Sequence, residues 1–94
     1  MLYYEKMEKD ILEIFDKFQK GEISLDDLKN YQEETYRNNI TYGLKVDPED
    51  NYNFLRCEKY WILLLDLIYN RIDKNRVKEY VYRIKAEDFI DRVK

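Results

Sequence analysis

The sequence predicts an all-α fold, a single-domain antiparallel four-helix bundle with a long loop between its second and third helices. Apolar residues recur at helical spacing along most of the chain, and short polar turns divide these segments. The 94 residues include only two glycines and one proline, whereas all-β folds need a turn signal about every 8–12 residues. A chain of this length forms one domain, residues 1–94, around one modest core.

The most apolar stretch predicts a central helix. Nine of the ten residues from Tyr60 to Tyr69 are apolar or aromatic. On a helix they give an apolar arc of roughly 200°, which suits a helix surrounded on most sides. Asp47 followed by Pro48 marks the start of this helix, and its apolar pattern continues to about Ile72. On the same helical wheel Leu63 and Leu67 lie next to the polar side.

The first helix is expected to run from about Leu2 or Tyr3 to Lys20. Its apolar residues step by three or four positions, which places them on one face. Lys20 in the last turn and Gly21 after it are typical signals of a helix C-terminus.

The second helix has the clearest start signal in the chain. Ser24 and Asp27 form a candidate capping box, and Ile23 can pack on Leu28 as a hydrophobic staple. The helix is expected over residues 25–37. Its apolar stripe is thinner than that of the first helix, so we expect it to be the least tightly held.

Two further features complete the expected topology. Two asparagines and a glycine predict a long connection over residues 38–46. A turn with Asp73 as a candidate cap separates the third helix from the fourth, whose apolar residues are Val77, Tyr80, Val81 and Ile84 and then Phe89, Ile90 and Val93. The apolar stripe changes face near Ala86, which predicts a kink or a short separate terminal helix there.

The residue types argue against an enzyme or a metalloprotein. The chain has no histidine and a single cysteine, so zinc and transition-metal ligands are lacking, and no cofactor is expected. Cys57 falls on the apolar side of its helix and is expected to be a small buried residue. Asp66 is the one acid inside an apolar run and is expected to be solvated. No phosphate-binding loop or activated nucleophile is recognisable.

The chain is expected to be a cytoplasmic protein that binds neither membranes nor nucleic acid directly. No apolar run approaches the ~20 residues needed to span a bilayer, and charges interrupt the N-terminus where a signal peptide would be apolar. The pI of about 5.0 opposes nucleic-acid binding by the basic residues near the fourth helix, Lys74, Arg76, Lys78, Arg83 and Lys85.

Acidic residues and tyrosines gather in one segment. Residues 22–58 contain nine acids and four bases, net −5, whereas residues 59–94 contain six acids and nine bases, net +3. Tyrosine is enriched at protein interfaces, and carboxylates steer a basic partner. A solvated acidic surface, and tyrosine enrichment by a low-GC genome, are the alternatives. The expected partner-binding residues are Glu33, Glu34, Tyr36, Tyr42, Asp47, Glu49, Asp50 and Tyr52.

Residues 14–31, with the sequence IFDKFQKGEISLDDLKNY, resemble bacterial immunity proteins of the colicin D type and related inhibitors of contact-dependent toxins. The shared features are a helix ending in an aromatic residue, a glycine turn, Ile-Ser, and an acid-rich helix. From Asn38 onward nothing specific to that family is found. The resemblance implies a small acidic helical protein that plugs the cationic active site of a nuclease. The carboxylates named above would then mimic phosphates, and Tyr36, Tyr42 and Tyr52 would lie at the rim.

The leading hypothesis is therefore a non-enzymatic inhibitor that binds and neutralises a cognate toxin, a nuclease with a basic surface. A phage-encoded inhibitor of host defence would use the same acidic mimicry. A small regulatory module that forms homodimers is the third hypothesis, and it predicts that Leu63 and Leu67 pack across a twofold interface.

Overall fold

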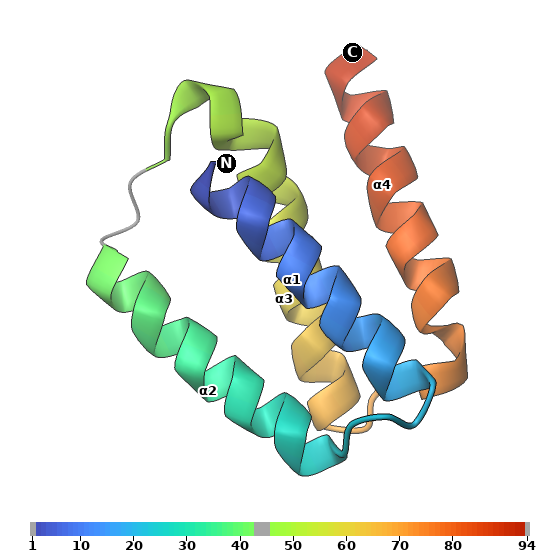
Figure 1. Cartoon of the computed structure of the whole chain (residues 1–94). Coiled ribbons are helices and arrows are strands. Elements are labelled where there is room, and N and C mark those ends of the chain that lie inside the picture. Colours follow the sequence, from blue (N-terminus) through green and yellow to red (C-terminus); the bar gives the residue numbers. More distant parts are fainter. Residues whose placement is uncertain (1, 43–45, 94) are drawn as a thin grey trace.

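The structure, a computed structural model, describes the backbone of residues 2–42 and 46–93 and the side chains of residues 2–39 and 46–86. Within these residues the chain forms four α-helices and two short 3₁₀ helices (Figure 1). In chain order the elements are α1 (Tyr3–Gln19), α2 (Leu25–Tyr42), η1 (Pro48–Asp50), α3 (Asn51–Ile68), η2 (Lys74–Arg76) and α4 (Val77–Val93). No strand occurs within these residues, which confirms the all-helical class with four helices. Successive helices alternate in direction along the chain (Figure 1).

The central position predicted for the third helix is confirmed, because α3 contacts each of the other three helices. The core lies toward the end of the molecule that holds the two short connections, where α1 and α3 end and α2 and α4 begin (Figure 1). At the opposite end α2 and α4 diverge from α1 (Figure 1). The buried core residues are Ile11, Phe15, Leu28, Tyr60, Leu63, Leu64, Leu67 and Val77.

The face that α3 buries differs from the one predicted. Leu63 and Leu67 are only 4% and 5% exposed, so they are core residues and cannot pack across an interface between two copies. Ile62, by contrast, is 60% exposed. The apolar arc of this helix is too wide for the sequence to define its centre, and the position of α3 between α1, α2 and α4 decides which side chains are buried.

Two helix boundaries also differ from expectation. α2 continues to Tyr42 rather than ending near Arg37, so much of the predicted connection over residues 38–46 is helical. Asn39 does not break the helix, because its side-chain oxygen accepts a hydrogen bond of 2.7 Å from the hydroxyl of Tyr3. Helix propensity is a weak preference that such tertiary contacts override. α4 is one uninterrupted helix through Ala86, so no separate terminal helix, one of the two predicted outcomes, begins there.

α1 and α3 terminate in the same way at their C-terminal ends. Gly21 after α1 and Asn70 after α3 adopt positive φ angles of 79° and 57°. At each end two backbone N–H groups beyond the helix donate to carbonyls of its last turn over 2.8–3.2 Å, the pattern of a Schellman motif. Asparagine tolerates the left-handed region, so α3 ends at Ile68 instead of Ile72. The expected C-terminal role of Gly21 is confirmed.

The predicted N-terminal signals are confirmed for two elements. The hydroxyl of Ser24 accepts the N–H of Asp27 at 3.2 Å, and the Asp27 carboxylate accepts the N–H of Ser24 at 2.8 Å, which completes the capping box. Asp73 caps η2 by accepting the N–H of Asn75 at 2.9 Å.

The N-terminal ends of α1 and α3 are joined by one buried carboxylate. Asp50, 2% exposed, accepts the backbone N–H groups of Tyr4 at 2.6 Å and Glu5 at 3.1 Å, and the side-chain amide of Asn53 at 2.9 Å. An aspartate that precedes α3 therefore caps α1, where the helix dipole favours a negative charge.

Three further contacts link α1 and α3 beside this cap. The ring of Tyr4 meets that of Phe54 edge-on, with 4.9 Å between centroids. Glu8 and Arg56 form a largely buried ion pair. The thiol of Cys57 lies 3.4 Å from the carbonyl oxygen of Tyr4 and donates to it, and Cys57 is buried as predicted. These contacts and the core hold α1 and α3 together along their length.

Replacing the buried cap should destabilise the protein strongly. Asp50→Ala removes the acceptor of two α1 N–H groups and should lower the free energy of unfolding by about 2–3 kcal/mol, whereas Asp50→Asn should cost less. Urea unfolding followed by circular dichroism measures both. The neighbouring exposed substitution Glu49→Ala is the matched control, with an expected change below about 0.5 kcal/mol. Equal effects at the two positions would contradict the assigned cap.

Substitutions at Gly21 and Asn70, the two residues with positive φ angles, should change the stability of the protein in opposite directions. Gly21→Ala places a Cβ at a φ of 79° and should cost about 1 kcal/mol, although no atom of the described structure lies near enough to clash. Asn70→Gly removes a Cβ from the same region and should be neutral or stabilising by a few tenths of a kcal/mol. Thermal unfolding midpoints compare the two variants directly, and a loss of stability in Asn70→Gly would contradict this assignment.

Candidate functional site

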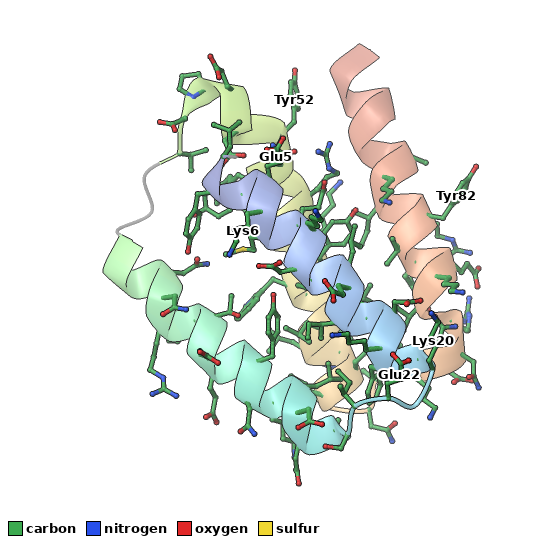
Figure 2. The ribbon with its side chains drawn as sticks, viewed as in Figure 1. Glu5, Lys6, Lys20, Glu22, Tyr52 and Tyr82 are labelled. Atoms are coloured by element: carbon green, nitrogen blue, oxygen red, sulfur yellow. The ribbon has the colours of Figure 1, made fainter. Side chains whose placement is uncertain are left out.

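The structure divides the predicted partner-binding residues between two regions. Glu33, Glu34 and Tyr36 are exposed on α2, whereas Asp47 and Glu49 are exposed at η1 and Tyr52 in the first turn of α3. Figure 2 places Tyr52 at the end of the molecule where α3 begins. Asp50 is buried in its cap and has almost no surface to offer a partner. The side chain of Tyr42 lies outside the described residues.

α2 carries the more exposed of these regions. Leu28 is its one buried residue between positions 25 and 39, so this helix is thinly packed. Glu33 and Glu34 are both exposed, and neither forms a hydrogen bond or ion pair with any residue in the described part of the chain. Their charges are therefore available to a partner.

A groove of about 550 Å³ separates α1 from α2 and reaches Glu34. The hydrogen bond from Tyr3 to Asn39 spans the two helices near one end of the groove. Lys6 projects from α1 toward α2 (Figure 2) and forms a 3.7 Å ion pair with Asp10. The lining residues are Tyr3, Lys6, Met7 and Asp10 from α1, and Tyr31, Glu34, Thr35 and Asn38 from α2.

The hydroxyl of Tyr31 gives the groove a permanent hydrogen-bonding group. Burial is the main cause that raises the pKa of Tyr31 to about 12; a hydrogen bond with Thr35 opposes the shift, and the charge of Asp10 adds to it. Tyr31 therefore stays protonated at neutral pH and can both donate and accept. Glu34 also borders a second hollow of about 410 Å³ along α2, lined with Asn30, Glu33, Arg37 and Asn38.

This arrangement suits a cationic side chain better than it suits a reaction. A lysine or arginine entering the groove would meet the carboxylate of Glu34 and the hydroxyl of Tyr31, and it would share Asp10 with Lys6, the cation that already pairs with Asp10 there. Elsewhere, burial above all, and then the charges of Glu8 and Asp50, raise the pKa of Cys57 to about 12, so its thiol remains neutral. Asp66 pairs with Arg71 at 3.0 Å.

Two other features, a metal-binding cluster and a membrane-spanning helix, are lacking among the described residues. They contain no group of three or more histidine, cysteine, aspartate or glutamate side chains placed to hold a metal ion. None of the helices in the described ranges is both long and apolar enough to cross a membrane.

The α1 side of the groove was not predicted from the sequence. Tyr3, Lys6 and Asp10 belong to a helix whose pattern indicated only an amphipathic packing element. The one available signal was Tyr3, which lies off the apolar stripe of that helix. No family model, curated protein or solved structure matches this chain, so a functional conclusion depends on its own residues.

The raised pKa values predict a loss of stability at alkaline pH. Cys57 and Tyr31 have ordinary pKa values of 9.0 and 10.0 when exposed, against about 12 for both in the folded protein. The unfolded chain releases these protons first, so their contribution is complete below about pH 9 and declines toward pH 12. Urea unfolding between about pH 8 and 11 should show the decline, at most about 1.4 kcal/mol per pH unit for each group. Cys57→Ala and Tyr31→Phe should each reduce the slope; an unchanged slope in both would contradict this origin.

Proposed function

We propose that this chain is a protein inhibitor that binds a basic surface of a cognate toxin, a nuclease, and neutralises it, as an immunity protein does. The observation that supports this proposal is the pair of exposed carboxylates, Glu33 and Glu34, without intramolecular partners in the described structure, beside a groove that can accept a cationic side chain. The resemblance of residues 14–31 to immunity proteins of the colicin D type points the same way.

In this proposal α2 presents phosphate-like charges to the active site of the toxin. Glu33 and Glu34 attract lysine and arginine side chains that would otherwise bind nucleic acid, and this attraction accelerates association. Tyr36, 54% exposed one turn from Glu33, adds a large contact area with few rotamers to immobilise. The second region, Asp47, Glu49 and Tyr52, would extend the contact at its edge.

The remaining helices serve as the scaffold in this proposal. The four helices act as an antiparallel bundle whose α1–α3 pair is fixed by the core and by the Asp50 cap. The inhibitor acts in the bacterial cytoplasm, where a nuclease would reach nucleic acid. A phage-encoded inhibitor of host defence would use the same surface, and the identity of the partner separates the two functions.

The first experiment identifies the partner and tests inhibition together. The tagged chain is used to capture proteins from a lysate of its source cell at low and at high salt, and the captured proteins are identified by mass spectrometry. The proposal expects a stoichiometric, salt-sensitive partner with a basic nuclease domain. The purified partner must then lose nuclease activity at a one-to-one ratio with the chain. A partner without nuclease activity, or full activity in the complex, would reject the toxin-inhibitor function.

Charge reversal on α2 should slow binding to that partner. Glu33→Lys combined with Glu34→Lys should lower the association rate constant by about tenfold or more at low salt, because steering of a basic partner is lost. Glu13→Lys with Glu22→Lys changes the net charge equally at exposed positions outside the groove and should have a much smaller effect. Stopped-flow or surface-based kinetics measure both, and similar rate losses in the two double variants would argue against a specific α2 face.

A further inference from the structure

A line of exposed apolar side chains runs along α3, and the proposed function does not use it. Leu55, Ile62 and Tyr69 are 40%, 60% and 67% exposed. They are spaced by seven residues, so they drift by only about 20° per step around a helix and form one ridge of about 21 Å. We call Leu55, Ile62 and Tyr69 the α3 ridge.

The α3 ridge lies on the opposite side of α3 from α1. Cys57 and Tyr60, which contact Tyr4 and Phe15 of α1, are placed roughly 140° and 160° around the helix from Ile62 at 100° per residue. None of the three ridge residues belongs to the buried core cluster. Along the helix, Glu58, Lys59 and Asp66 lie between the three ridge residues. A seven-residue repeat of exposed apolar side chains is typical of helix-to-helix pairing.

We propose that the α3 ridge binds a second copy of this chain, with the two α3 helices antiparallel and the twofold axis next to Ile62. For the ridge residues, which lie in the plane of contact, residue i faces residue 124 − i of the copy. Leu55 therefore packs against Tyr69 of the copy, and the two Ile62 side chains meet. An antiparallel pair is isologous, so each contact occurs twice.

The charges beside the α3 ridge select this partner and this orientation. Lys59 and Asp66 lie on the same flank of the ridge, three residues before and four after Ile62. The antiparallel register brings Lys59 of each copy next to Asp66 of the other, which forms two attractive pairs. A parallel register would place lysine against lysine and aspartate against aspartate. Lys59 and Asp66 both already have interactions within the chain, Asp66 with Arg71 at 3.0 Å, so the dimer would extend these contacts into a network.

The opposite flank is compatible with the same register. There Glu58 of one copy faces Leu65 of the other, so no like charges meet. The contact involves one helix from each copy and is smaller than a standard interface, so we expect a dissociation constant on the order of 100 µM.

Sedimentation equilibrium of the whole chain tests the dimer. At about 1 mM the wild type should approach twice the chain mass of 11.8 kDa, and at about 1 µM it should have the mass of one chain. Ile62→Lys should weaken association by more than about tenfold. Tyr82→Lys, at a 75% exposed position on α4, is the matched control and should dimerise like the wild type. A wild-type mass of one chain at both concentrations would overturn the proposal and leave the α3 ridge to a different protein.

Mixing two charge variants tests the register. Lys59→Glu and Asp66→Lys each place like charges across the twofold axis, so each alone should dimerise more weakly than the wild type. An equimolar mixture should dimerise again, because the heterodimer regains two opposite-charge pairs. Failure of the mixture to recover would overturn the antiparallel register.

A disulfide test covers the case in which Asp66→Lys does not fold. Leu55→Cys and Tyr69→Cys are prepared separately, each with Cys57→Ser to remove the native thiol. The proposed register predicts that an interchain disulfide forms mainly in the mixture, because position 55 faces position 69. Disulfides that form equally in the separate samples would contradict it.

Discussion

The rest of the structure depends on the carboxylate of Asp50 at the start of α1. A helix N-terminus leaves backbone N–H groups without intrahelical partners, and here the side chain that satisfies two of them comes from a residue 45 or 46 positions away in sequence. This contact fixes the N-terminal ends of α1 and α3 side by side, while the core fixes the opposite end of the molecule. The α1–α3 pair is thus held at both ends, and α2 and α4 attach to it at the end where the core lies.

This unequal attachment creates the surface that α2 exposes. Leu28 anchors the helix in the core, and the Tyr3–Asn39 hydrogen bond ties its far end to α1 across a groove. A helix packed through so few apolar contacts gains little stability from burial, so most of its side chains remain in solvent. The carboxylates of Glu33 and Glu34 are exposed there, and in the proposed function both would contact a basic partner.

Local signals in the sequence predicted local structure well. The Ser24–Asp27 capping box, the Gly21 terminus and the Asp73 cap all involve residues within a few positions of each other, and all three are present. Contacts between residues far apart in the chain could not be predicted from the sequence. In the sequence Asp50 lies just after the predicted start of the third helix, among the predicted partner-binding residues, and only the folded chain shows that it caps α1.

The same limit applies to α3 and to the candidate site. With nine apolar residues in ten from Tyr60 to Tyr69, the sequence does not specify which side of α3 is buried. Leu63 and Leu67, which the helical wheel places next to the polar side, are buried, and Ile62 is exposed. The thin apolar stripe of α2 made the exposure of Glu33 and Glu34 predictable from the sequence. The groove was not predictable, because it depends on how α1 and α2 diverge in the folded chain. In the two proposals the exposed surfaces have separate roles. The α3 ridge would bind a second copy at little cost in ordering entropy, because α3 is the most enclosed helix, and α2 would supply charge to a basic partner. A dimer through α3 would carry two α2 faces, and a partner with two basic sites would bind it more tightly by avidity.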